Sequence, residues 1–355
     1  MNEQIEQLQQ ELHLTLKQGE RNRRKIGIFR AITYGGALLY FVGMVVMQIV
    51  VYSSGDVSFF YTLNPNPTFF EQYKMLIIII PLFILITIGG FGLSRYLKKY
   101  TEAEQNSIRR IIRAMFPDAK LALLPSEVST SMLQQSNFFG GIDSRYTFGQ
   151  SLGMVIFDNG DSKITVRDMI VNKGKQANRL AQTSLGSFVL IFQMMFKGIF
   201  AKRVENIAGS FRGMFADAYL EKKINGSVVV LPDHLESKLD YLAKNIQALK
   251  NVNGNKLVTL EDVEFERYFA VYASDEVLAR YVLTPAMMLR MTELKKKYNR
   301  DIMLSFNSNR FYFAVAMPEG FLTLGASSLT SGEALKDLYD NFDTTRKILS
   351  DLRLN

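Results

Sequence analysis

Two long apolar stretches near the start of the sequence restrict the fold more than any other feature. They cover residues 31–52 and 75–94, and neither contains a charged side chain. A helix of about twenty residues crosses the roughly 30 Å hydrocarbon core of a bilayer, and a helix satisfies its own backbone there. A buried core helix of a soluble domain normally keeps a polar stripe, which both stretches lack. The sequence therefore predicts two transmembrane helices.

Basic residues gather on the outer flanks of these stretches. The short loop 53–74 between them is rich in aromatic residues and has a single lysine, at its very end. By the positive-inside rule we expect both termini to be cytoplasmic and the loop to lie outside. The basic residues expected to face the lipid headgroups are Arg21, Arg23, Arg24, Lys25, Arg95, Lys98 and Lys99.

Composition excludes several kinds of chemistry. The 355 residues include no cysteine and only two histidines, His13 and His234. Disulfide frameworks, thiolate metal sites, thiol nucleophiles and multi-histidine metal centres are therefore excluded within one chain. A hydrophobic fraction of 48% is too high for a disordered protein, and the length allows two or three domains.

The chain divides into four parts. Residues 1–25 are expected to form a short amphipathic helix and a basic cluster, and residues 26–97 the transmembrane hairpin. Residues 98–117 read as a juxtamembrane stalk helix that continues from the second span and ends at Pro117. The remaining 118–355 are expected to form a cytoplasmic domain.

The pattern of the cytoplasmic part predicts an α+β fold. Strands and helices are mixed without regular βαβ alternation. Expected strands cover 152–157, 163–171, 226–232, 256–260, 265–272, 302–306 and 311–316, with hairpins across residues 158–161 and 307–310. Expected helices cover 126–136, 235–253, 277–298 and 332–352, the third beginning anew at Pro285.

The segment 183–200 is ambiguous. Its uncharged core is too short for a comfortable span, and lysine and arginine follow it closely. We read it as a buried strand or helix of the soluble domain. Insertion into the membrane surface is the second reading, and a third crossing is the least favoured.

Known catalytic signatures are missing from the sequence. The glycine-rich segment 138–153 lacks the ending of a P-loop, and there is no nucleophile elbow, zincin motif or kinase set. The net charge of +8 gathers beside the apolar stretches, which does not favour nucleic-acid binding. We therefore expect no cofactor, no metal and no nucleic acid.

One acidic segment, 260–285, is the strongest candidate for a polar site. Its carboxylates could supply oxygen ligands to magnesium or calcium. The favoured reading is surface charge, with a pair between Asp275 and Arg280 that braces a strand-to-helix turn. His234, beside Asp233, is read as a residue at the start of a helix.

Two blocks of sequence resemble the bacterial domain-of-unknown-function family 3137. The first is FRGMFADAYLEKKINGSVVVLPD at 211–233, and the second is the acidic segment. The resemblance spans most of the chain, including the paired apolar stretches, and implies location in the bacterial inner membrane; no activity is implied. The motif residues singled out are Phe211, Gly213, Phe215, Glu261, Phe265, Glu266, Asp275, Arg280, Thr284 and Pro285.

The resulting expectation is a membrane-anchored, non-enzymatic protein. Its cytoplasmic domain is expected to bind another membrane protein or to assemble with itself. The alternative is a membrane-bound enzyme or a sensor of a small ligand or lipid that uses the carboxylates of Glu261–Glu276. Lipid handling by the basic stalk and segment 185–200 is a third possibility.

Overall fold

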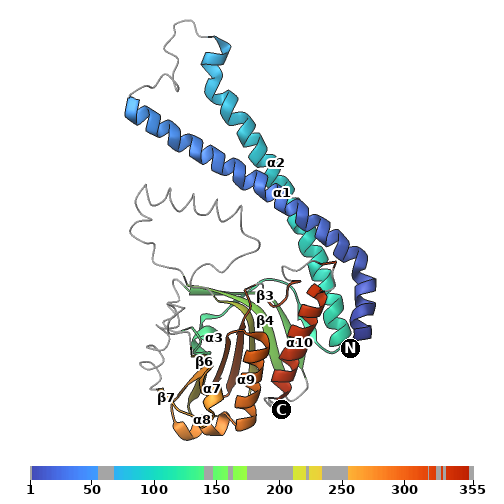
Figure 1. Cartoon of the computed structure of the whole chain (residues 1–355), viewed down its shortest axis with the longest axis vertical. Coiled ribbons are helices and arrows are strands. Elements are labelled where there is room, and N and C mark those ends of the chain that lie inside the picture. The colour runs from blue at the N-terminus through green and yellow to red at the C-terminus, as the bar shows by residue number, and fades with distance from the viewer. Residues whose placement is uncertain are drawn as a thin grey trace. The chain divides into compact units, whose positions relative to one another are not determined.

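The computed structural model describes most of the chain (Figure 1). The described residues are 2–54, 68–139, 147–158, 163–173, 211–220, 224–233, 255–318, 320–324, 329–330 and 333–351. Of these, residues Glu11–Glu104 form one compact unit, while residues 2–10 and those from Gln105 onward form a second. Each unit is described by itself.

Two long helices carry the apolar stretches. Helix α1 spans Asn2–Ser54 and helix α2 spans Phe69–Met115. The sequence suggests a separate N-terminal helix, but α1 is continuous, because residues 2–30 are mostly strong helix formers without proline. Helix α2 runs on without a break through the residues expected to form the stalk and ends just before Pro117. Pro81 lies inside α2.

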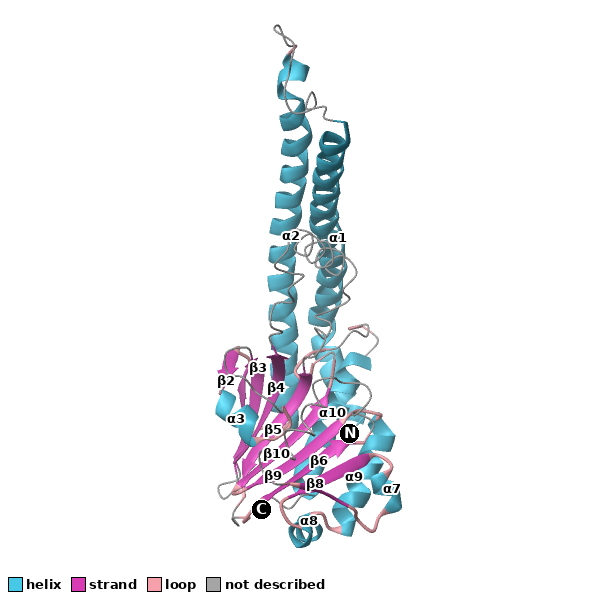
Figure 2. Ribbon diagram, turned by 90° about the vertical axis from the view of Figure 1, so that its left-hand side faces the viewer, coloured by secondary structure: helices cyan, strands magenta, loops and turns pink. Residues whose placement is uncertain are grey.

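The second unit is built on one antiparallel sheet of ten strands (Figure 2). The strand order is β1-β3-β4-β5-β10-β9-β6-β8-β7, and β2 pairs with β3 beside this path. The strands are β1 (Lys120–Ala122), β2 (Ser126–Val128), β3 (Thr147–Asp158), β4 (Lys163–Lys173), β5 (Phe211–Tyr219), β6 (Ser227–Pro232), β7 (Lys256–Val258), β8 (Phe269–Ala273), β9 (Ile302–Asn307) and β10 (Arg310–Ala316). The predicted α+β class is confirmed.

Both predicted hairpins are present. Strand β3 pairs antiparallel with β4, and β9 pairs antiparallel with β10. The β9–β10 turn uses Ser308, whose φ of 60° is the left-handed conformation that such tight turns require. Strand β5 then adds to β10, so that residues far apart in sequence form the centre of the sheet.

Five further helices are found among the described residues of this unit. They are α3 (Thr130–Gln135), α7 (Val263–Glu266), α8 (Glu276–Val282), α9 (Pro285–Tyr298) and α10 (Glu333–Asp351). The predicted restart at Pro285 and the C-terminal helix are confirmed.

Two predicted elements were partly wrong. The helix expected over 126–136 begins only at Thr130, because Ser126–Val128 pair with β3 and Ser129 caps the helix. The strand expected over 265–272 begins only at Phe269, because Asp262 caps the short helix α7 before it.

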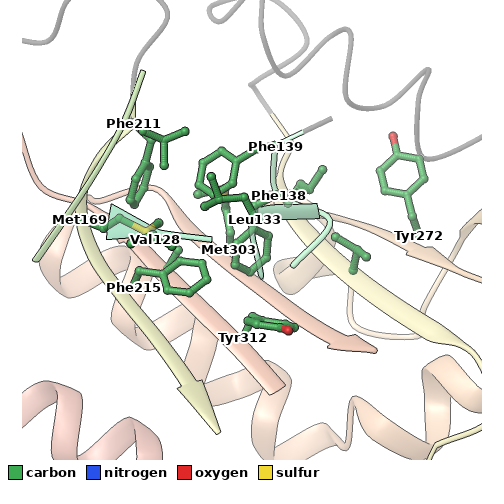
Figure 3. Close-up of a cluster of buried hydrophobic side chains, with 14 residues drawn as sticks. Val128, Leu133, Phe138, Phe139, Met169, Phe211, Phe215, Tyr272, Met303 and Tyr312 are labelled. Carbon is green, nitrogen blue, oxygen red and sulfur yellow. The ribbon is translucent and has the colours of Figure 1, made fainter. Parts of the chain in front are cut away.

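The sheet buries side chains on both faces. On one face, α3 and Phe138 pack over a cluster that includes Phe215 and Tyr312 (Figure 3). On the opposite face lie α9 and α10 (Figures 1 and 2), with Met288, Met291, Leu335, Leu338 and Phe342 buried. This two-sided burial explains why β5 and β6 are buried along nearly their whole length.

Three predictions fall outside the described residues. These are the ambiguous segment 183–200, the helix expected over 235–253, and the position of His234. Most of the loop between the two apolar stretches, residues 55–67, also lies outside them.

Candidate membrane-interface site

Helices α1 and α2 pack closely as an antiparallel pair. A Cβ atom added at Gly36 would lie 3.1 Å from Ile86, and one added at Gly89 would lie 3.0 Å from the backbone nitrogen of Thr33. Position 33 of α1 thus lies beside position 89 of α2, and position 36 lies beside position 86, as expected for helices that run in opposite directions. Small residues therefore allow the two helix backbones to approach, as they do in membrane helix pairs.

The outer surface of this pair is apolar. Side chains such as Leu39, Phe83 and Phe91 are about two-thirds or more exposed (66%, 67% and 72%). Both helices are long and apolar enough to cross a membrane, and little of either apolar window is buried in the protein. The two helices are therefore candidate membrane spans, consistent with a membrane-associated role.

An aromatic residue joins the basic clusters of the two helices. The Lys25 Nζ atom lies 3.4 Å from the Tyr96 hydroxyl and 4.8 Å from the centre of its ring. The Lys99 Nζ atom lies 6.0 Å from the same ring centre. Phe29 stacks on Tyr96 with ring centres 5.4 Å apart. Two lysines separated by 74 positions in sequence thus share one tyrosine ring, and we call Lys25, Tyr96 and Lys99 the lysine–tyrosine cluster.

The other predicted headgroup residues surround this cluster. Arg21, Arg24, Arg95 and Lys98 are exposed on the same two helices. Glu20 pairs with Arg23 at 3.1 Å, and Arg24 lies 4.0 Å from it. Within the described part of the chain, no carboxylate pairs with Lys25, Arg95, Lys98 or Lys99. The structure therefore brings together two basic groups that the sequence could only place on separate helices.

The first motif block forms part of the sheet core. Phe211 and Phe215 lie on β5, are buried, and contact Phe139 and Phe138 respectively. Gly213, between them, lies opposite Ala316 of β10, where the two backbones come very close. These residues serve packing of the sheet.

The acidic motif block supplies helix caps. Asp262 accepts hydrogen bonds from two backbone N–H groups of α7, and Asp275 accepts one from Leu278 at the start of α8. The Glu266 carboxylate accepts one from the Leu260 N–H at 2.6 Å, whereas Glu261 is exposed. Among the described residues, no group of three or more acidic or histidine side chains could hold a metal ion.

The predicted pair between Asp275 and Arg280 was wrong. Arg280 instead pairs with Glu276 at 2.8 Å, one helical turn away, because Asp275 is turned toward the helix start as its cap. Thr284 caps α9 in the same way, and Pro285 occupies its first turn. The two motif blocks do not converge, since three strands separate β5 from β8 in the sheet.

A surface ion pair links the acidic block to α9. The Lys296 ammonium donates a hydrogen bond to Glu264, and this bond raises the pKa of Lys296 above its usual value. Both side chains are exposed. The pair ties α7 to α9 and has the character of a surface contact.

Sequence reasoning missed two polar clusters inside the sheet. Arg212 pairs with Asp168 at 3.4 Å on the face covered by α9 and α10. On the other face, Asp217 accepts from Arg167 and lies 3.7 Å from Arg310, whose guanidinium stacks on Tyr219. A charged residue within a strand that is otherwise apolar on both faces, as in FRGMFA, is the only signal the sequence offers.

Tyr312 belongs to the aromatic cluster on the face of the sheet that α3 covers, and its hydroxyl gives this cluster a polar group. Its hydroxyl donates to the Gln135 side chain at 3.1 Å, which fastens the end of α3 to the sheet. Burial raises the pKa of this hydroxyl above its usual value. The contact holds α3 in place over the cluster in Figure 3.

The close approach of α1 and α2 gives a first prediction. We expect Gly92→Leu to force the helices apart at a cost of about 1–3 kcal/mol, because a Cβ atom there would overlap the Phe29 ring. Spin labels on Leu39→Cys and Phe83→Cys, introduced into this cysteine-free chain, measure the separation. The distance distribution should be narrow in the parent and broader and longer in Gly92→Leu. Gly90→Leu is the matched control, since a Cβ atom at Gly90 meets nothing within 4 Å, and equal broadening in both would contradict the packing.

Comparison with known proteins gives one family and one structural similarity. Among solved structures, the chain is similar to the crystal structure of the mycobacterial trehalose monomycolate transport factor A, TtfA, with a TM-score of 0.35 and 10% sequence identity. That similarity covers 71% of this chain and 95% of the other. A comparison with curated proteins finds no match. The family model described as "Protein of unknown function (DUF3137)" matches residues 209–354, which include both sequence blocks that carry the resemblance.

Proposed function

We propose that the protein is anchored in the bacterial inner membrane by α1 and α2, and that its cytoplasmic sheet domain binds a second copy of itself. The helices supply the anchor, with the N- and C-termini in the cytoplasm and the loop after Ser54 outside. The domain from β1 to α10 supplies a binding surface rather than a reaction centre.

The anchor is supported by the order of side chains along the helix pair. On both helices the exposed apolar residues adjoin exposed basic residues, which come before them on α1 and after them on α2, where Tyr96 also lies. Tyrosine and lysine are the side chains that favour the boundary between hydrocarbon and headgroups. The basic residues of both helices lie at the same end of the helix pair. The start of α1 and the end of α2 therefore belong on the cytoplasmic side.

The observation that carries the binding role is a group of exposed apolar side chains at the β8 end of the sheet. Val277 and Tyr281 lie one turn apart on α8 and are 71% and 59% exposed. Leu257 of β7, Val263 of α7 and Leu289 of α9 are exposed on elements adjoining β8 or α7. We call these five residues the β8-end surface. Exposed apolar side chains on adjoining elements are a common feature of protein–protein contact sites.

The enzymatic alternative has less support from the geometry. Asp262 and Asp275 are occupied as helix caps, and Glu266 and Glu276 bond to Leu260 and Arg280. A catalytic carboxylate needs to face a substrate, whereas these face their own backbone or a surface arginine. The acidic block is thus better explained as local structure.

In-cell photo-crosslinking tests the binding role. A photoreactive phenylalanine analogue replaces Val277 in a full-length chain that is co-expressed with a differently tagged copy. We expect a crosslinked species carrying both tags, because Val277 is the most exposed residue of the β8-end surface. Tyr281→Glu, which places a charge one turn away, should reduce its yield at least about fivefold.

The matched control carries the photoreactive residue at Lys336, an exposed position of α10. A yield at Val277 no higher than at Lys336 would overturn self-assembly through this surface. A crosslink to a protein other than the second copy would replace self-assembly by binding of another membrane protein.

A further inference from the structure

We infer that the lysine–tyrosine cluster is a binding site for the headgroup of an anionic phospholipid in the cytoplasmic leaflet. This inference rests on the proposed membrane anchor, and it adds a ligand class to the residues that flank that anchor. The site is formed by Lys25 of α1 with Tyr96 and Lys99 of α2.

Two positive charges lie around one neutral ring in this cluster. Both ammonium groups are within about 6 Å of the ring centre of Tyr96. Among the residues the structure describes, neither lysine has a carboxylate partner, so their charges are compensated only by solvent and by the ring. An anion with several oxygen acceptors could bond both ammonium groups and relieve their repulsion.

The cluster lies at the depth where lipid phosphates are found. Lys25 precedes the first uncharged stretch by six residues, and Lys99 follows the second by five. At about 1.5 Å per residue these offsets are roughly 8–9 Å along the helices. The headgroup layer on each side of the hydrocarbon core is about 5–8 Å thick, and lysine side chains extend toward it by several ångströms. The Tyr96 ring, closer to the core, is at the interfacial level.

A lipid is favoured over a soluble anion because exposed apolar residues of α2 lie near the lysine–tyrosine cluster. Phe91 and Ile88, exposed apolar residues of α2 on the membrane side of the cluster, can pack against acyl chains. A free phosphate or a nucleotide would contact the lysines alone. The exposed Arg95 and Lys98 add positive charge on the same helix and strengthen attraction to an anionic leaflet.

Native mass spectrometry of the full-length chain tests the site. The protein is released from detergent in the presence of equal amounts of phosphatidylglycerol and phosphatidylcholine, and bound lipids are counted. We expect phosphatidylglycerol to be preferred in the parent chain. Lys25→Gln/Lys99→Gln should reduce this preference at least about fivefold, and Lys25→Arg/Lys99→Arg, which keeps both charges, should restore most of it.

The matched control is Arg109→Gln/Arg110→Gln. It removes the same charge from exposed positions of α2, ten residues farther from the apolar stretch. The site requires that this control keep the preference for phosphatidylglycerol. An equal loss in both variants would mean that charge acts diffusely, and the site would be overturned. Loss of bound lipid when phosphate replaces chloride at equal ionic strength would overturn the choice of a lipid ligand.

Failure of the anchor and failure of the site give different results. Alkaline carbonate extraction of cell membranes is carried out on the parent and on Lys25→Gln/Lys99→Gln. If the parent is released into the supernatant, the anchor itself is wrong. If both proteins stay in the membrane and both bind the two lipids equally, the anchor stands and the headgroup site is wrong.

Discussion

Gly213→Ala is expected to destabilise the sheet domain by about 3 kcal/mol or more. The reason is the approach of β5 to β10, where no room exists for a side chain. A Cβ atom at Gly213 would overlap the carbonyl oxygen of Val315 and lie 2.7 Å from the nitrogen of Met317. Both atoms belong to backbone, which cannot move aside as a flexible side chain would.

The backbone angle at Gly213 adds to this steric cost. Its φ is 157°, in a range that residues with a Cβ atom rarely adopt. Arg212, the preceding residue, accepts a hydrogen bond at its carbonyl from the Met317 N–H at 2.9 Å, so a shift of β5 would also break that bond. The overlap can therefore be relieved only if β5 and β10, the two central strands of the sheet, separate.

Hydrogen exchange of the full-length chain in detergent measures this effect. A loss of about 3 kcal/mol corresponds to exchange about 100-fold faster in peptides from β5 and β10. Gly27→Ala is the control, because a Cβ atom there meets nothing within 4 Å and alanine favours the helix. Unchanged exchange in β5 and β10 of Gly213→Ala would contradict the close approach of these strands.

Arg212→Met is expected to cost about 3–5 kcal/mol, because it leaves the Asp168 charge buried without its arginine. Asp168 is 1% exposed and Arg212 is 8% exposed, so solvent screens their pairing very little. The Leu322 N–H donates to the same carboxylate at 3.2 Å, which joins this ion pair to the segment after β10. By contrast, Arg280→Met removes a surface pair with Glu276 and should cost no more than about 1 kcal/mol.

Removing both charges should restore much of this loss. In Arg212→Met/Asp168→Asn, the asparagine oxygen can still accept from the Leu322 N–H, and no buried charge remains. We expect the double variant to be more stable than Arg212→Met alone, as measured by hydrogen exchange in β4 and in peptides that contain Leu322. A double variant no more stable than the single one would show that the guanidinium stabilises the fold by packing rather than by charge.

The local elements of this fold could be predicted from the sequence because their signals are local. Asp158-Asn159-Gly160-Asp161 marked the β3–β4 hairpin, and Pro285 marked the restart of a helix at α9. The two uncharged stretches likewise predicted the long helices α1 and α2. Each of these features depends on residues within about twenty positions of one another.

The parts that could not be predicted depend on residues far apart in sequence. Arg212 and Asp168 are 44 positions apart, and only the pairing of β4 with β5 makes them neighbours. Lys25 and Tyr96 are 71 positions apart and meet only through the register of the two helices. The predicted ion pair of Asp275 with Arg280 was wrong because Asp275 acts as a helix cap instead. That role depends on the exact backbone conformation of Asp275, which the sequence alone does not show.

Topology in the membrane tests the central claim most directly. Single cysteines are introduced at Ser54, at the end of α1, and at Asp351, at the end of α10, into a chain that has no other cysteine. An impermeant maleimide is applied to spheroplasts and, separately, to lysed cells. We predict that Ser54→Cys reacts in spheroplasts whereas Asp351→Cys reacts only after lysis. Reaction of Asp351→Cys in intact spheroplasts would contradict it.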